Sequence, residues 1–140
     1  MNEVETAQQE VIEEFAFFDN WMDRYQYLID LGRRLPELSE SDRNDKNRIR
    51  GCQSQVWMVA EADGERLNFR AISDAAIVSG LIALLLRIYS GKKAVDIVAT
   101  PADFVSALQL EQHLSPTRSN GLAAMLQAIQ AYAAEAVQAA

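Results

Sequence analysis

QVWMVAEADGERLNFRAI, residues 55–72, is the stretch that decides the fold, because its apolar residues fall at every second position on both sides of Asp63-Gly64. A period of two indicates β-strands with one apolar face, and Asp-Gly is a strong signal for a hairpin turn. A two-residue turn at this point fixes the register and gives chemically matched neighbours. The predicted pairs are Met58 with Phe69, Glu61 with Arg66 and Trp57 with Arg70. A lone hairpin is only marginally stable, so helices are expected to cover its apolar face.

Outside the hairpin, the apolar residues recur with the helical period of about 3.6 residues. Residues 75–91 are apolar on most of their circumference, so we expect the central helix of the domain there, capped by Ser73 or Asp74. The last helix is expected to start at Ser115-Pro116 or Ser119-Asn120, with a buried stripe of Leu122, Met125, Leu126, Ile129 and Val137. Further predicted elements are helices over 5–18 and 21–35, a surface loop over 36–47, a candidate third strand around 48–50 and short helices within 92–112.

The composition is that of an ordinary globular protein, with 140 residues of which 49% are hydrophobic and 24% charged. This length predicts a single domain over residues 1–140. The net charge of −7 opposes the phosphate backbone, so nucleic-acid binding is not expected. The sequence has neither a run of about 18 apolar residues nor a signal-peptide pattern, and we therefore expect a cytoplasmic protein without a membrane span. One cysteine and one histidine cannot form a Cys/His zinc cluster, so no metal is expected.

The only cysteine, Cys52, follows a basic segment, residues 43–50, in which four cations and one aspartate give a net charge of +3. Free cysteines are usually buried packing residues. Cys52, however, has polar neighbours, and the apolar alternation begins only at Val56, so we place it in a polar loop that enters the first strand. Nearby cations lower the pKa of a thiol, which makes the basic segment a candidate activator of Cys52. Alternatively, these charges are simply solvated.

A single thiol limits the chemistry that this loop supports. Without a second cysteine, an oxidised or sulfur-loaded Cys52 finds no resolving thiol within the chain, so whatever it accepts must leave through a partner. This property favours a carrier. A second hypothesis is a thiol hydrolase in which His113 acts as the base, and a third is a regulatory binding module without covalent chemistry.

Four ordered blocks carry a resemblance to a known family. They are NWMDRYQYLIDLGRRLPEL at 20–38, IRGCQSQVW at 49–57, SDAAIVSGLIALLLRIYSG at 73–91 and QHLSPTRSNGLAAM at 112–125. In these blocks the chain resembles the SufE family of sulfur acceptors, which serve cysteine desulfurases in iron–sulfur cluster assembly. After the glycine it reads Cys-Gln-Ser-Gln and not the Cys-Glu-Asn-Arg that is typical of a paralogous branch, so the resemblance is to the SufE branch proper.

The resemblance implies an α+β fold in which a small antiparallel sheet of two to three strands packs against helices, similar to IscU-type scaffold proteins. It also implies that Cys52 is the catalytic residue and carries a cysteine persulfide intermediate. In that role it takes sulfur from a SufS-like cysteine desulfurase, stimulates this enzyme and delivers the sulfur to a SufBCD-like iron–sulfur scaffold complex. The protein would then be a sulfurtransferase-like carrier without a cofactor of its own, since pyridoxal phosphate belongs to the desulfurase.

Several residues are predicted to assist Cys52. The neighbours with an expected supporting role are Gly51, Gln53, Ser54 and Gln55. Arg118 is expected either to lie near Cys52 and steady its thiolate or persulfide, or to cap the neighbouring turn. Asp74 is a candidate for contact with the partner besides its predicted role as a helix cap. Because reductants remove an exposed persulfide, Cys52 is expected to rest against the apolar face of the hairpin and the central helix, and to swing out when the desulfurase docks.

Overall fold

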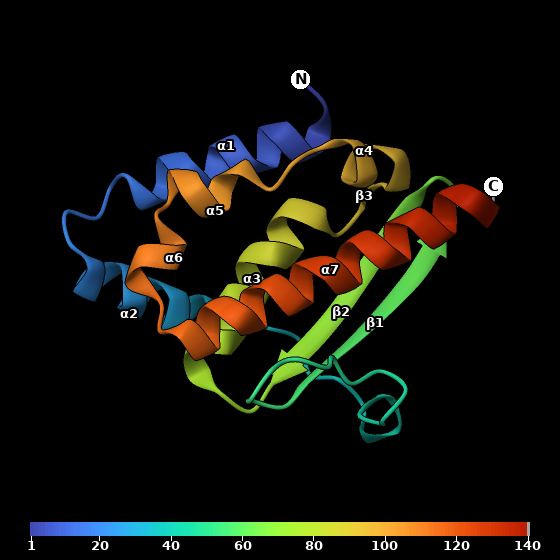
Figure 1. Cartoon of the computed structure of the whole chain (residues 1–140), viewed down its shortest axis with the longest axis horizontal. Coiled ribbons are helices and arrows are strands. Elements are labelled where there is room, and N and C mark those ends of the chain that lie inside the picture. Colours follow the sequence, from blue (N-terminus) through green and yellow to red (C-terminus); the bar gives the residue numbers. More distant parts are fainter. Residues whose placement is uncertain (140) are drawn as a thin grey trace.

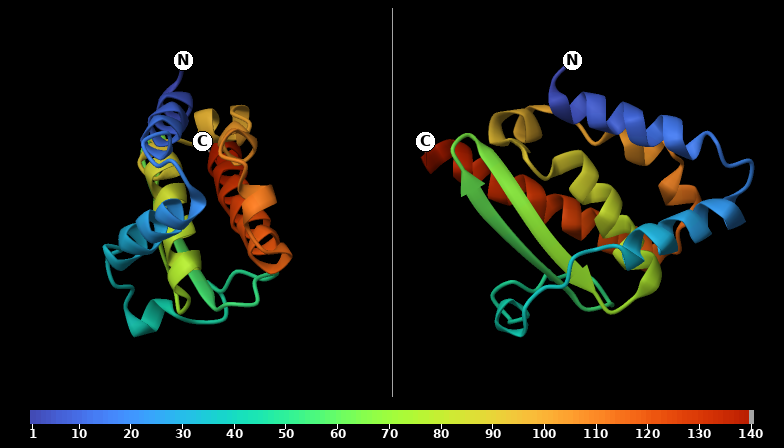
Figure 2. Two further views of the ribbon diagram at one scale, coloured as in Figure 1. Left: turned by 90° about the vertical axis from the view of Figure 1, so that its left-hand side faces the viewer. Right: turned by 180° about the vertical axis from the view of Figure 1, so that it is seen from behind.

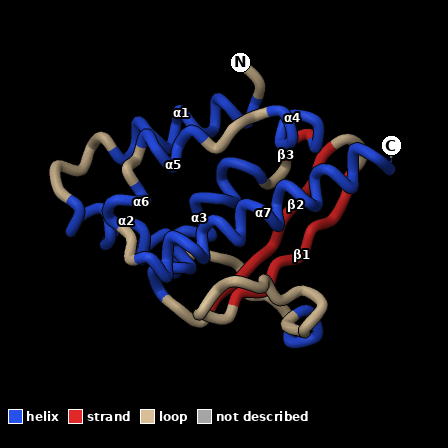
Figure 3. Tube along the Cα trace, in the orientation of Figure 1, coloured by secondary structure: helices blue, strands red, loops and turns tan. Residues whose placement is uncertain are grey.

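The hairpin predicted from the alternating residues forms two strands of a three-stranded antiparallel sheet in the computed structural model, which describes residues 1–139. β1 (Val56–Asp63) pairs with β2 (Arg66–Ser73), and β2 pairs with the short β3 (Lys92–Lys93). Figures 1 and 3 show β1 and β2 as one long hairpin that runs along one side of the molecule. The α+β fold class with a small antiparallel sheet is confirmed.

The register of the hairpin differs by two residues from the predicted one. The turn is Gly64-Glu65 and not Asp63-Gly64, so Asp63 pairs with Arg66. Gly64 has a φ of +61° and is followed by a residue with negative φ, as the first central position of a type II′ turn requires. Because the shift is an even number of residues, every side chain stays on its predicted face. Instead of the predicted partners, Met58 faces Ala71, Glu61 faces Asn68 and Trp57 faces Ile72.

Seven α-helices within residues 1–139 make up most of the rest of the fold, and their positions follow the predicted helices. They are α1 (Glu3–Phe15), α2 (Trp21–Arg33), α3 (Ala76–Tyr89), α4 (Ala94–Ala99), α5 (Asp103–Ala107), α6 (Leu110–His113) and α7 (Pro116–Ala139). A capping box of Asn2 and Glu5 starts α1 two residues earlier than predicted. The predicted loop over 36–47 contains one short 3-10 helix, Glu40–Asp42. Within the described residues, no helix combines the length and the apolar character needed to cross a membrane.

The third strand is not where the sequence suggested. Residues 48–50 contribute a single bridge, in which Arg48 faces Trp57. The third strand is β3, which follows α3 directly in a stretch predicted as helical. A strand of two residues is too short to show a period of two, so its sequence carries no strand signal.

The central helix α3 is buried, as its apolar circumference predicts. It contacts α1, α2, α7 and β2, and Figure 2 shows it between α1 and α2 on one side and α7 on the other. From α7, Leu122, Met125 and Ile129 enter the core, as predicted. Val137 was predicted on the same stripe but is 37% exposed, because the last turns of α7 lie beside the exposed hairpin turn.

Two glycines set how closely α2 and α3 approach each other. A Cβ atom on Gly80 would lie 2.3 Å from the backbone oxygen of Leu28, and one on Gly32 would lie 2.7 Å from the backbone nitrogen of Gly80. Both distances are far shorter than van der Waals contact, so a side chain at either position would push the helices apart. This crossing fixes the first half of α3, which is the part that reaches the loop around Cys52.

The cap predicted for α3 is wrong. The helix begins after Ala75, and no side-chain hydrogen bond caps it. Ser73 Oγ accepts the N–H of Ala75 at 3.2 Å, while Asp74 Oδ1 accepts the backbone N–H of Gln55 at 3.1 Å. The loop before β1 offers Asp74 an unpaired backbone donor, so its carboxylate fixes that loop and not the helix.

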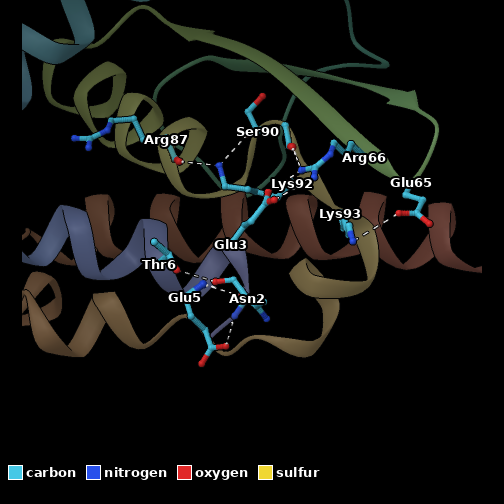
Figure 4. A network of polar contacts seen from close by, with 11 residues as sticks. Asn2, Glu3, Glu5, Thr6, Glu65, Arg66, Arg87, Ser90, Lys92 and Lys93 are labelled. Atoms are coloured by element: carbon cyan, nitrogen blue, oxygen red, sulfur yellow. Dashed lines mark hydrogen bonds and ion pairs between the residues drawn. The ribbon is translucent and has the colours of Figure 1, made fainter.

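Polar contacts connect the start of α1 to the turn end of the hairpin (Figure 4). Arg66 Nη1 donates to Glu3 Oε2 at 2.7 Å, which joins β2 to α1. Lys93 of β3 pairs with Glu65 of the turn at 3.8 Å. These contacts lie at the opposite end of the hairpin from the start of β1. They join α1, β2 and β3 to one another and are remote from the region around the cysteine.

Candidate functional site

Cys52 lies in a short loop, residues 50–55, that leads into β1 and is called the Cys52 loop below. Its base is closed where the N–H of Ile49 donates to the carbonyl oxygen of Val56 at 2.9 Å. Gly51 has a φ of +90°, a backbone conformation that residues with a side chain rarely adopt. The polar strand-entry loop predicted from the sequence is therefore present. The positive φ of Gly51 turns the backbone directly before Cys52.

The Cys52 side chain lines a small cavity of about 20 Å³ between the Cys52 loop, α3 and α7. Its Sγ lies 3.6 Å from the carbonyl oxygen of Gly121, within reach of a weak S–H···O hydrogen bond. The residue is half-buried and packs against the core. The other lining residues are Gln53 and Ser54 from the loop, Val78 and Leu81 from α3, and Thr117, Arg118, Gly121 and Met125 from α7. The expected contact with the central helix is thus present, but α7 takes the place predicted for the hairpin face, since no residue of β1 or β2 lines the cavity.

Burial affects the pKa of the Cys52 thiol. Removal from solvent raises the pKa of Cys52, because the charged thiolate loses its hydration. The basic segment 43–50 does not offset this effect, and its members Arg43, Lys46 and Arg50 are exposed. The interpretation of these cations as solvated surface charges is therefore the one that fits. In this arrangement, burial favours the neutral thiol of Cys52 over the thiolate.

The predicted supporting residues divide into two groups. Gln53, Ser54 and Arg118 line the same cavity as Cys52. Arg118 is also in the first turn of α7, where its backbone N–H donates to Ser115 Oγ at 3.3 Å. The side chain that caps this turn is therefore that of Ser115, and of the two positions predicted for Arg118 the structure supports the one near Cys52. Gln55 does not line the cavity. It is held by its backbone to Asp74, which stands outside the cavity at the base of the loop.

Neither the histidine nor an acidic cluster joins Cys52 in the cavity. The His113 ring stacks on Trp21 with ring centroids 4.2 Å apart, and its carbonyl oxygen accepts the hydroxyl of Tyr25. It is not a lining residue, so the structure does not bring together the Cys/His pair that a hydrolase requires. Over residues 1–139, no group of three or more His, Cys, Asp or Glu side chains is placed to hold a metal ion.

Sequence reasoning missed the apolar walls and the glycine of the cavity. The helical periodicity identifies the cavity residues Val78, Leu81 and Met125 only as core residues. A helical periodicity does not distinguish a residue that packs in the core from one that lines a cavity. Gly121 did offer a signal, because glycine inside a helix is unfavourable and calls for a packing reason. That reason becomes visible only when α7 is placed against the Cys52 loop.

Comparison with known proteins identifies the family to which this chain belongs. Residues 9–133 match the SufE family, described as an Fe-S metabolism associated domain. The chain belongs to the SufE family, as the four sequence blocks indicated, and this membership implies a part in iron–sulfur metabolism with a cysteine desulfurase as partner.

Two relatives support this assignment, and one solved structure shares the fold. An uncharacterized SufE-like protein of Rhizobium meliloti (strain 1021) is 44% identical over 133 residues, which cover 91% of this chain and 95% of the relative. A second uncharacterized SufE-like protein, from Rhizobium etli, is 46% identical over 125 residues, or 86% of this chain and 84% of the relative. The solution structure of a hypothetical protein from Thermus thermophilus has a TM-score of 0.77 at 22% identity, covers 94% of this chain and 96% of its own, and shows the same fold.

Proposed function

We propose that this protein accepts persulfide sulfur on Cys52 from a cysteine desulfurase, stimulates that enzyme and delivers the sulfur to an iron–sulfur scaffold complex. The observation that carries the proposal is the placement of the only cysteine of a SufE-family chain in a tight loop, with its thiol in a small, mostly apolar cavity. A cysteine that serves only packing would not need Gly51 at positive φ before it, nor the Ile49–Val56 hydrogen bond that closes the loop.

The transfer step is a thiol exchange in which no net oxidation occurs. The Cys52 thiolate attacks the outer sulfur of the persulfide on the desulfurase, and a new S–S bond forms at Cys52. The S–S bond of the desulfurase breaks, its cysteine leaves as a thiolate, and the proton stays with the transferred sulfur. Cys52 then carries the sulfur as a persulfide until an acceptor thiolate on the scaffold repeats the same exchange.

The burial that raises the pKa of Cys52 suggests that the carrier has a resting state with a protonated thiol and a docked state with a reactive one. In the resting state the protonated thiol reacts slowly, because the thiolate is the nucleophile. When the desulfurase docks, the Cys52 loop swings out, the thiol is rehydrated and its pKa falls toward the ordinary value. Reactivity is then confined to the complex, and the persulfide returns to the cavity afterwards.

The other parts of the proposal concern the surroundings of this reaction. The protein acts as one domain in the cytoplasm, without a cofactor of its own, while the pyridoxal phosphate that releases sulfur from cysteine belongs to the desulfurase. Arg118 lines the cavity beside Cys52, where its positive charge would favour a thiolate or a persulfide anion. Asp74 is exposed beside the loop, so it is available to the docked partner as well as to Gln55.

Desulfurase turnover tests the proposal. Alanine release from free cysteine is measured with the desulfurase alone, with the wild-type protein, with Cys52→Ser and with His113→Gln. We expect stimulation by wild type and by His113→Gln, and none by Cys52→Ser although it still binds. Stimulation that survives in Cys52→Ser would instead indicate a non-covalent regulator, and loss of activity in His113→Gln would indicate Cys/His catalysis.

A further inference from the structure

Gly121 is a glycine inside a long helix. It is the sixth residue of α7 (Pro116–Ala139) and is buried. Glycine in a helix interior is less favourable than alanine, because it loses more backbone entropy on folding. A neighbour that needs the space of the missing side chain would explain why glycine stands there.

That neighbour is Cys52. A Cβ atom added at Gly121 would meet Cys52 Sγ at 3.6 Å and no other atom within 4 Å outside its own chain neighbours and helix backbone. This distance is ordinary van der Waals contact, so alanine would touch the thiol without a clash. The resting thiol alone therefore does not require glycine, but an extra atom on Cys52 that points toward position 121 would.

The size of the cavity matches one such atom. Its volume is about 20 Å³, and a water-sized particle needs roughly 10–15 Å³. A sulfur atom is of similar size, whereas a larger adduct such as glutathione is not. Val78, Leu81 and Met125 make most of the wall apolar, which disfavours the entry of water and of charged reductants.

We propose that the missing side chain of Gly121 leaves the space that holds the outer sulfur of the Cys52 persulfide, so that Gly121 is a positioning residue of the carrier. This inference rests on the function proposed above. Glutathione removes the sulfur when its thiolate attacks the outer atom, the persulfide bond breaks, Cys52 leaves as a thiolate and glutathione keeps the sulfur as glutathione persulfide. A methyl group at position 121 displaces the outer sulfur toward the loop opening, where this attack is faster.

The test compares wild type, Gly121→Ala and the control Ala123→Ser, which changes an exposed residue of the same helix. Each protein is loaded by a cysteine desulfurase with pyridoxal phosphate and free cysteine, separated from it, and mixed with glutathione. Intact mass spectrometry follows the loss of the added sulfur. We expect loss at least about fivefold faster in Gly121→Ala than in the other two. The alkylation rate of the reduced thiol should stay within about twofold, because the thiol itself keeps its contacts.

Each other outcome contradicts the inference in a recognisable way. Equal rates of sulfur loss from loaded wild type and Gly121→Ala would overturn the positioning role alone. An equal rise in sulfur loss and in thiol alkylation would mean that the substitution loosens the whole loop, which also overturns it. A lower unfolding temperature for Gly121→Ala would show that alanine does not fit as argued. If wild type itself takes up no sulfur, the proposed function fails together with this inference.

Discussion

Asp74 and Gln55 are joined by two hydrogen bonds that close the base of the Cys52 loop. The carboxylate Oδ1 of Asp74 accepts the N–H of Gln55 at 3.1 Å, and the N–H of Asp74 donates to the carbonyl oxygen of Gln55 at 3.4 Å. The second bond is between backbone atoms, so only the first depends on the side chain. Gln55 follows Cys52 closely along the same loop, so we expect this pair of hydrogen bonds, called the clip below, to restrain the movement of the thiol out of its cavity.

Asp74→Ala is expected to make Cys52 more reactive in the free protein. A net contribution of about 1 kcal/mol for one hydrogen bond corresponds to about a fivefold change in the opening of the loop. The rate of alkylation by iodoacetamide should rise by about this factor. Asp63→Ala serves as the control, since it removes the same charge from an exposed position near the hairpin turn. An unchanged rate in Asp74→Ala, or an equal rise in both variants, would show that the clip does not restrain the loop.

The pH dependence of alkylation is expected to report the burial of Cys52. Because desolvation raises its pKa, a smaller fraction of the thiol is ionised at a given pH in the folded protein than in the unfolded chain. The midpoint of the rate against pH should therefore lie higher for native protein than for protein unfolded in urea. Restricted access lowers the whole rate curve without moving its midpoint, so the two effects separate. A native midpoint at or below the unfolded one would contradict the protected resting thiol.

Gly80→Ala is expected to destabilise the protein strongly. Its Cβ would lie 2.3 Å from a backbone oxygen of α2, and backbone cannot rotate away as a side chain can. We expect a loss of about 3 kcal/mol in the free energy of unfolding, measured by urea denaturation. Gly121→Ala is the matched control, because the same change there meets a side-chain atom at 3.6 Å. A loss below about 1 kcal/mol for Gly80→Ala would show that the helix crossing adapts more easily than its geometry indicates.

The sequence predicted the faces of the hairpin better than its register. Alternation places Val56 and Met58 on the buried face whichever residues form the turn, because a shift of two keeps each side chain on its side. The choice between Asp63-Gly64 and Gly64-Glu65 depends on turn type, and both put a glycine at a position that accepts positive φ. Periodicity cannot decide between them.

The candidate site was predictable where it depends on local sequence. Cys52 in a polar loop, with Gly51 before it, follows from the neighbours along the chain. The apolar walls of the cavity come from α3 and α7. Their position relative to Cys52 depends on the crossing of α2 and α3 at Gly80 and on the packing of α7. The periodicity of apolar residues along the sequence does not specify either arrangement. The rise in the pKa of Cys52 is likewise a product of this tertiary burial, and charge counting along the chain suggested the opposite direction.

The central claim, that Cys52 carries sulfur, is tested most directly by intact mass spectrometry of the protein mixed with a cysteine desulfurase, pyridoxal phosphate and free cysteine. The account predicts that wild type gains the mass of one sulfur atom, that a reductant removes it, and that Cys52→Ser gains none. Wild-type protein that binds the turning-over desulfurase and still gains no sulfur would contradict it.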